Sequence, residues 1–311
     1  INSPFYGAIF LHMKEIKKPN FIIIGAMKAA TTSLYTYLKQ HPDVFMTHIK
    51  EPMFFNNFKT ENNYIVKGRK GSKISTLKEY YALFDNAENE IALGEASPAY
   101  IYNKNCATLI KEHLPEVKII AILRQPVKRA YSNYLHAKRA DREPINSFID
   151  AINSEEERIE KNWSPLYHYK EKGFYFRQLS RYFKEFKKEQ IKVILFEDII
   201  DNPQKITKEV FEFLGVDSSF APDTSKKANV AGKPKGVAGW IVMKLRKNNL
   251  IPNIEFSKYL PEFIVSYILK TIYSKPEKID NKTINNLTNK YYKEDIKQLE
   301  KLIERDLSNW L

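Results

Sequence analysis

The feature that most constrains the fold is an apolar strand that runs into a glycine and then into a helix, in the stretch NFIIIGAMKAATTSL at residues 20–34. The run from Phe21 to Ile24, which includes three isoleucines, is typical of a strand buried on both faces of a parallel sheet. A turn is expected at Gly25, and helical spacing begins at Thr31. This order of elements predicts an α/β fold.

The loop between this strand and this helix is suited to binding an anion. It points backbone N–H groups and the positive end of the helix dipole at one position, where an anion is stabilised by about 0.3 to 2 kcal/mol. Lys28 adds a mobile positive charge, and Thr31 and Thr32 add hydroxyl donors. The loop fails the Walker A pattern G-x-x-x-x-G-K-[ST], because Ala30 replaces its second glycine and Thr31 its lysine. We therefore expect a nucleotide phosphate here without magnesium–triphosphate geometry; an ordinary exposed loop lysine is the alternative.

Predicted strands alternate with predicted helices along the chain, which favours right-handed crossovers in a parallel sheet. We expect strands at 20–25, 91–95, 117–124 and 191–196. We expect helices at 31–40, 76–84, 104–114, 126–139, 173–188, 203–214, 236–248 and 283–305, and loops at 56–75 and 226–239. The predicted fold is a P-loop-like open parallel sheet flanked by helices, with helical additions towards the C-terminus. Ligands of such sheets bind beyond the carboxyl ends of the strands.

Length and composition limit the class of protein. We expect residues 13–311 to form one domain, preceded by a leader or appended segment at 1–12. The longest apolar runs, such as residues 117–123, fall far short of the ~20 residues of a membrane span, so we expect a soluble protein without one. The single cysteine, Cys106, allows no internal disulfide, which suits a cytoplasmic location.

The net charge of +13 comes mostly from lysines interleaved with glutamates at helical spacing, which is the pattern of a solvated surface. An anionic partner such as a nucleic acid, an acidic glycan or a polyphosphorylated cofactor is the alternative explanation. The sequence contains no zinc-ligand spacing and no nucleic-acid-binding signature. We therefore expect neither a metal nor a nucleic-acid partner.

A second group of polar residues follows the predicted strand at 117–124. Arg124 stands at the tip of this strand, Pro126 begins the next helix, and Ser132 lies near the end of the second helical turn. A guanidinium group holds phosphate through its planar fork, and a nearby hydroxyl can share the same anion. A Walker B strand would instead end in an aspartate for magnesium. A structural salt bridge is the alternative role for Arg124.

Seven segments, in order over residues 22–311, are IIIGAMKAATTSL, KEPMFF, GEASPAY, ILRQPVKRAYSNYL, KGFYFRQLSRYFKEF, ILFEDI and DIKQLEKLIERDLSNWL. Together they resemble the sulfotransferase family that uses 3′-phosphoadenosine 5′-phosphosulfate (PAPS), and are most similar to bacterial members and to the heparan-sulfate branch. The resemblance implies in-line transfer of a sulfuryl group to an acceptor hydroxyl, with adenosine 3′,5′-bisphosphate (PAP) as product and no metal. The expected acceptor is a hydroxyl-bearing small molecule, a lipid or a glycan.

The resemblance also implies roles for individual residues. Lys28 would face the 5′-phosphosulfate and stabilise the charge that develops on its bridging oxygen. The same phosphate would contact Ala29, Ala30, Thr31, Thr32 and Ser33. The 3′-phosphate would bind Arg124 and Ser132, under a basic loop for which Lys233, Lys235 and Gly236 are the candidates. Tyr175 is placed near the nucleotide by the resemblance, or else packs in the core.

Glu51 in KEPMFF is the candidate general base, because the heparan-sulfate branch uses the glutamate of a similar K-E-x-x-F-F segment. Partial burial beside Phe54 and Phe55 would raise the pKa of this carboxylate and make it a better base. A loop salt bridge with Lys50 is the alternative role for Glu51. Glu95 and His48 are the next candidates for the base.

Two departures from heparan 3-O-sulfotransferases weigh against a heparan acceptor. Met53 stands in place of their histidine and Ala96 in place of their lysine. Two other functions also stay open on the sequence, namely a P-loop kinase-like phosphotransferase and a non-catalytic module that binds acidic glycans.

Overall fold

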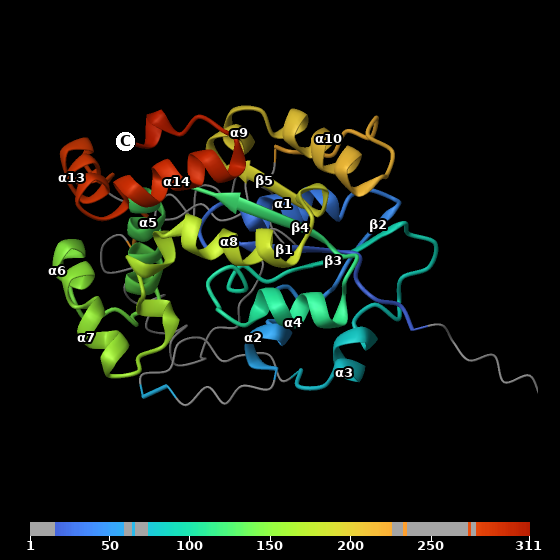
Figure 1. The fold of residues 1–311 in the computed structure, drawn as a ribbon, viewed down its shortest axis with the longest axis horizontal. Helices are drawn as coiled ribbons and strands as arrows, with labels where there is room; N and C mark the ends of the chain where they lie inside the picture. Colours follow the sequence, from blue (N-terminus) through green and yellow to red (C-terminus); the bar gives the residue numbers. More distant parts are fainter. Residues whose placement is uncertain (1–15, 59–63, 66–73, 226–232, 235–272, 275–277) are drawn as a thin grey trace, which may run out of the picture.

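The computed structural model describes residues 16–58, 64–65, 74–225, 233–234, 273–274 and 278–311. Its centre is a five-stranded sheet in the spatial order β2-β3-β1-β4-β5 (Figure 1). The strands are β1 (Phe21–Gly25), β2 (Val44–Met46), β3 (Ala92–Ala96), β4 (Lys118–Leu123) and β5 (Ile191–Leu195). Every neighbouring pair in this sheet is parallel. The predicted P-loop-like parallel sheet is therefore confirmed.

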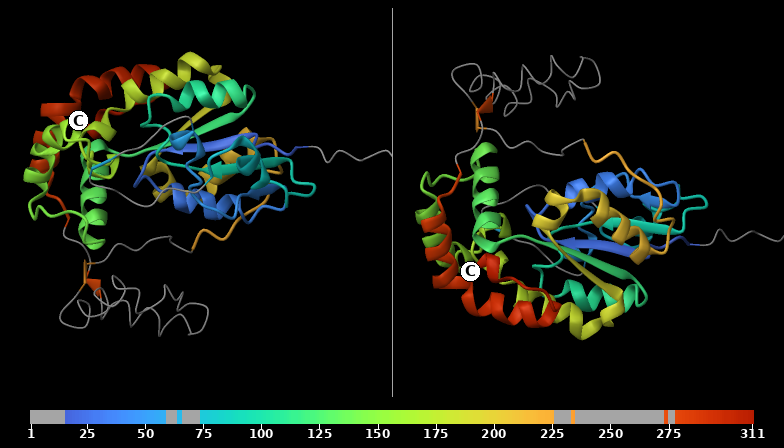
Figure 2. Two further views of the ribbon diagram at one scale, coloured as in Figure 1. Left: turned by 90° about the horizontal axis from the view of Figure 1, so that it is seen from below. Right: turned by 90° about the horizontal axis from the view of Figure 1, so that it is seen from above.

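Helices cover both faces of the sheet, as the two views of Figure 2 show. One face carries α4 (Cys106–His113), α8 (Tyr175–Glu185) and α14 (Lys293–Ile303), and the other carries α1 (Thr31–Leu38) and α10 (Pro203–Leu214). Because no face is left to solvent, strands such as β1 and β4 are almost continuous apolar runs whose side chains are buried.

The remaining elements surround these layers. The other helices in the described residues are α2 (Phe54–Asn57), α3 (Leu77–Ala82), α5 (Pro126–Arg139), α6 (Phe148–Asn153), α7 (Glu155–Glu160), α9 (Phe196–Asp201) and α13 (Asn281–Leu287). Short 3₁₀ turns are η1 (Pro165–Tyr167), η2 (Glu171–Gly173), η3 (Lys188–Gln190) and η6 (Ser308–Trp310), and η5 (Thr288–Tyr292) is a π turn. Two short strands, β6 (Lys233–Pro234) and β7 (Tyr273–Ser274), pair antiparallel. No helix in the described part of the chain is long and apolar enough to cross a membrane.

The predicted elements agree with the structure in the sheet and differ in detail elsewhere. The four expected strands are present, and β2, which has only three residues, was not predicted. The single helix expected at 283–305 is divided by η5, where the hydroxyl of Tyr292 donates to the carbonyl of Lys170 at 2.9 Å. The helix expected at 236–248 and most of the loops expected at 226–239 and 56–75 lie outside the described residues. Within the loop expected at 226–239, residues 233–234 instead form the short strand β6.

Gly25 sets the point at which β1 turns into the loop before α1. A Cβ atom at this position would lie 2.4 Å from Cγ2 of Ile101, a distance that real Cβ atoms do not tolerate. The backbone of Ile101 also donates a hydrogen bond to the carbonyl of Ile24. The segment after β3 is thus packed directly against the end of β1, and this contact requires glycine.

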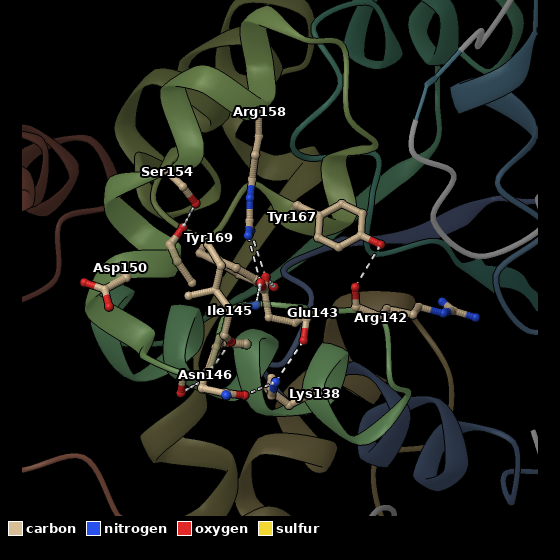
Figure 3. A network of polar contacts seen from close by, with 12 residues as sticks. Lys138, Arg142, Glu143, Ile145, Asn146, Asp150, Ser154, Arg158, Tyr167 and Tyr169 are labelled. Carbon is tan, nitrogen blue, oxygen red and sulfur yellow. Dashed lines mark hydrogen bonds and ion pairs between the residues drawn. The ribbon is translucent and has the colours of Figure 1, made fainter. Parts of the chain in front are cut away.

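A buried ion pair fastens α7 to the segment that follows α5 (Figure 3). Arg158 donates two hydrogen bonds of 2.7 Å to the Glu143 carboxylate, and the Tyr169 hydroxyl donates a third of 2.6 Å. Burial alone would raise the pKa of Glu143, but the hydrogen bonds from Arg158 and Tyr169 outweigh it and hold the pKa below its usual value. Only 3% of either charged residue is exposed, so each charge depends on the other.

Glu143→Gln is expected to lower the free energy of unfolding by about 2 kcal/mol, because the Arg158 charge would stay buried without its counter-charge. Chemical denaturation measures this loss. Glu157→Gln is the matched control, since Glu157 pairs with Lys161 on the exposed surface of α7, and we expect no measurable change there. Equal losses in the two variants would show that burial of the Glu143 pair is unimportant.

Candidate active site

The loop between β1 and α1 has the backbone of an anion site. Lys28 and Ala30 both have positive φ angles, 69° and 66°, which fold the loop tightly against the start of the helix. Ala30 is the N-cap of α1 and contributes no side-chain hydrogen bond. The first N–H groups of α1, from Thr31 to Ser33, therefore point out of the helix end with the positive end of its dipole.

The amino group of Lys28 lies in a strongly positive environment. Burial lowers its pKa, the nearby charges of Arg139 and Arg124 lower it further, and Glu51 opposes them in part, so the pKa falls from 10.5 to about 8. Lys50 adds a smaller depression of the pKa. A bound anion would relieve this repulsion, which is how a site for a polyanionic ligand behaves.

Arg124 reaches from the tip of β4 to the same loop. Its Nη1 donates to the carbonyl oxygen of Lys28 at 3.1 Å, and its guanidinium carbon lies 4.3 Å from the ring centroid of Phe196. Its Nε atom is buried and has no hydrogen-bond partner among the described residues. Arg124 is therefore fixed by its Nη1 hydrogen bond, and its Nε–H remains available to donate to a phosphate.

Tyr175 holds the backbone of Arg124 through a hydrogen bond. Its hydroxyl donates to the backbone carbonyl of Arg124 at 2.8 Å, and its side chain is fully buried beside Trp310. In this structure Tyr175 is a core residue that holds the tip of β4. A contact with the nucleotide stays a prediction.

One face of α5 carries Ser132, His136 and Arg139 at helical spacing of i, i+4 and i+7. Burial and the charges of Lys28 and Arg139 lower the pKa of His136 to about 4, so its imidazole is neutral at neutral pH. Its Nδ1 lies 3.3 Å from Nη2 of Arg139. Of these three residues, only Ser132 was predicted from the sequence; the spacing in SNYLHAKR could have added His136 and Arg139 to the candidates.

Glu51 lies at the carboxyl end of β3. Its backbone N–H donates to the carbonyl of Ala96 at 3.1 Å, and the amino group of Lys50 contacts its carboxylate at 2.9 Å. About 24% of its side chain is exposed, so the carboxylate remains accessible to a ligand. Its charge acts on both Lys28 and His136. The structure therefore brings Glu51 and Lys28, predicted from separate motifs, into one site.

The two alternative bases occupy different environments. Glu95 is fully buried, and burial raises its pKa to about 7 despite hydrogen bonds from Ser97, Tyr100 and Tyr80. His48 is exposed in the segment before Glu51. Glu95 cannot touch a ligand from this position, whereas Glu51 can.

The other predicted ligands are only partly described. Ala29 is buried in the loop, Thr31 is buried at the start of α1, and Thr32 and Ser33 are half-buried in the same turn of the helix. Lys233 lies in β6, its side chain is not described, and Lys235 and Gly236 lie outside the described residues. Within the described ranges, no three His, Cys, Asp or Glu side chains gather closely enough to hold a metal ion.

Comparisons with known proteins identify the family. The family model of the sulfotransferase family matches residues 19–221. The chain is 31% identical to a sulfotransferase from Alicyclobacillus acidocaldarius, whose crystal structure matches with a TM-score of 0.73 over 95% of this chain and 99% of that one.

Curated relatives agree with this result. The chain is 26% identical over 275 residues to the membrane-associated sulfotransferase kil1 of Dictyostelium discoideum, covering 64% of this chain and 56% of kil1. It is 29% identical over 209 residues to mouse bifunctional heparan sulfate N-deacetylase/N-sulfotransferase 1, covering 65% of this chain and 22% of that protein. The chain thus spans only part of the length of these relatives. On the family match and the similarity to the bacterial enzyme, the chain belongs to the sulfotransferase family.

Proposed function

We propose that the protein transfers the sulfuryl group of PAPS to an acceptor hydroxyl by in-line displacement and releases PAP. The observation that carries this proposal is the meeting of Lys28, Arg124 and Glu51 beyond the carboxyl ends of β1, β4 and β3. Two cations surround an uncapped helix N-terminus, and one accessible carboxylate lies beside them. This set of groups suits a polyanionic donor and an acceptor that must lose a proton.

The donor side of the site is assigned to the loop and to β4. Lys28 and the N–H groups at the start of α1 hold the 5′-phosphosulfate, and Lys28 stabilises negative charge on the bridging oxygen as the S–O bond breaks. Arg124, whose Nε has no hydrogen-bond partner in the described part of the chain, and Ser132 hold the 3′-phosphate. Lys233, Lys235 and Gly236 are proposed to complete this end of the site.

Glu51 is assigned to the acceptor side. Its carboxylate takes the proton of the acceptor hydroxyl while the acceptor oxygen forms the new O–S bond, and the electron pair of the broken bond stays on the phosphate of PAP. Two similar proteins from mouse are carbohydrate sulfotransferase 15 and bifunctional heparan sulfate N-deacetylase/N-sulfotransferase 1, which supports a glycan acceptor. The proposal also includes lipid and small-molecule hydroxyls as acceptors. A cytoplasmic location is proposed as well.

Mass spectrometry tests the proposal whatever the chemical class of the acceptor. Extract of the source organism is incubated with the protein and PAPS, and we expect at least one compound to gain one SO₃ group. A parallel incubation with ATP and magnesium is the control for a kinase. Gain of a phosphoryl group in the ATP sample, with no gain of SO₃ in the PAPS sample, would contradict the proposal.

Arg124→Ala is expected to weaken the binding of PAP by about 10- to 100-fold, because it removes a charge-assisted pair worth about 1.5 to 3 kcal/mol. Calorimetric titration with PAP measures the effect. Lys128→Ala is the matched control, since Lys128 is an exposed cation in the first turn of α5, and its loss should change the affinity little. Tight PAP binding by Arg124→Ala would place the 3′-phosphate elsewhere.

The affinity for PAP should depend on pH through Lys28. The protonated amine binds the anion, and its pKa in the free protein is about 8, so affinity is lost as the pH rises through 8. We expect a decrease of about tenfold between pH 7 and pH 9. Lys28→Arg should flatten this profile because a guanidinium stays charged over the whole range. An unchanged profile in Lys28→Arg would assign the titration to another group.

A further inference from the structure

The segment that carries Glu51 has an unfavourable backbone conformation. Glu51 and Met53, on either side of Pro52, have positive φ angles of 62° and 53°. The left-handed region is disfavoured for residues that have a Cβ atom, and such residues persist only where surrounding contacts hold them. The turn at 51–53 therefore needs identifiable restraints.

Two hydrogen bonds supply the restraints, and both come from the residues that follow Glu95. The N–H of Glu51 donates to the carbonyl of Ala96 at 3.1 Å, and the N–H of Met53 donates to the hydroxyl of Ser97 at 3.0 Å. The backbone N–H of Ser97 in turn donates to the carbonyl of Ile23 at 3.0 Å. The turn is thus attached to β3 and, through Ser97, to the neighbouring strand β1.

The orientation of the Ser97 hydroxyl is fixed by Glu95. The hydroxyl donates its only hydrogen to Oε2 of Glu95 at 2.8 Å, which leaves its lone pairs free to accept from Met53. Tyr80 donates to the other carboxylate oxygen, Oε1, at 3.3 Å. Ser97 and Glu95 are both fully buried, so neither can touch a ligand. A buried carboxylate is costly, and here it directs a hydroxyl at the turn that carries Glu51.

We propose that Ser97 and Glu95 are positioning residues that hold the turn at 51–53, and with it the carboxylate of Glu51, in the site opposite Lys28. The proposal rests on the role of Glu51 as general base proposed above. It gives a function to the GEAS segment, whose glutamate cannot act as a base itself. Without the Ser97 hydroxyl, Met53 loses its acceptor and the turn is free to relax towards a commoner conformation.

Ser97→Ala tests the proposal by removing both hydrogen bonds of the hydroxyl. We expect the maximal rate of labelled sulfuryl transfer from PAPS to the acceptor fraction of the host extract to fall by about 10- to 100-fold, the usual cost of a small misplacement. The affinity for PAP should stay the same, because the donor site is formed by other elements. Rates are expressed per folded protein, measured by thermal unfolding.

Two variants of the same cluster serve as controls. Tyr80→Phe removes a tyrosine hydroxyl that donates to the Glu95 carboxylate but leaves the link from Ser97 to Met53, so it should lower the melting temperature and keep the rate within about twofold to threefold of wild type. Glu95→Gln keeps an oxygen that can accept from Ser97 and should retain most of the rate. Glu95→Leu offers no acceptor and should lose rate as Ser97→Ala does.

The outcomes separate the positioning role of Ser97 and Glu95 from the role of Glu51 as general base, on which it rests. If Glu51→Gln retains full turnover, Glu51 is not the base and both proposals fail. A second outcome is that Glu51→Gln is inactive while Ser97→Ala and Tyr80→Phe lose rate equally, or lose it only in proportion to folded protein. In that case Glu51 keeps its role as the base, and the positioning role of Ser97 and Glu95 is overturned. Adding Ser97→Ala to Glu51→Gln should cause no further loss, because the two act through one carboxylate. An additive loss in the double variant would also overturn positioning.

Discussion

Glu51→Gln is expected to lower turnover by about 10² to 10⁴-fold while the affinity for PAP stays unchanged. The substitution keeps the shape of the side chain and removes the basic electron pair that would accept the acceptor proton. Steady-state transfer rates over a range of pH, with PAP titration on the same sample, measure both effects.

A structural role for Glu51 predicts a different result. If its main function is the pair with Lys50, which is 2.9 Å away, the variant should melt at a lower temperature and keep activity in proportion to folded protein. Lys50→Met breaks the same pair from the other side and is the matched control. Equal activity in Glu51→Gln and Lys50→Met would remove Glu51 from the chemistry, and His48 would become the accessible candidate.

Lys28→Ala is expected to lower turnover by about two orders of magnitude or more, through loss of charge stabilisation on the leaving oxygen. Folding should be little affected, because the side chain is a half-buried loop lysine in a repulsive positive environment. Lys39→Ala, at the other end of α1, removes an exposed lysine and should behave as wild type. Near-normal turnover in Lys28→Ala would exclude Lys28 from the mechanism.

The sheet and the loop could be predicted because their signals are local. Strands covered on both faces tend to be apolar along their length, so β1 and β4 stand out in the sequence, and the glycine that ends β1 marks the turn. The edge strand β2 has three residues, too few to show a pattern. The short helix α7 is held by a buried pair between Glu143 and Arg158, 15 positions apart, which no local pattern reveals.

The candidate site likewise contains residues that local sequence could place and residues that only the packing of distant segments brings together. Lys28 and Arg124 follow strands, so the sequence could place them at one edge of the sheet. The contact between Glu51 and the end of β3, and the approach of His136 to Lys28, join segments that are 45 and 108 positions apart in this numbering. These contacts depend on how α5 and the turn at 51–53 pack over the sheet. Tyr175 was ambiguous because its hydroxyl bonds to a backbone carbonyl, which the sequence cannot specify.

The two alternatives from the sequence make distinct predictions about ligands. A P-loop kinase would be stabilised more by ATP with magnesium than by PAP. A module that only binds acidic glycans would be retained on heparin in a salt-dependent manner and would transfer no sulfuryl group. The family match favours neither alternative, and both are tested by the incubations and titrations described above.

The central claim is that the site recognises a nucleotide with a phosphate at the 3′ position. Calorimetric titration of PAP against adenosine 5′-monophosphate tests it most directly, because the two differ only in that phosphate. The account predicts that PAP binds about 10- to 100-fold more tightly, and that Arg124→Ala abolishes most of the difference. Equal affinities for the two nucleotides in the wild-type protein, or tighter binding of ATP with magnesium than of PAP, would contradict it.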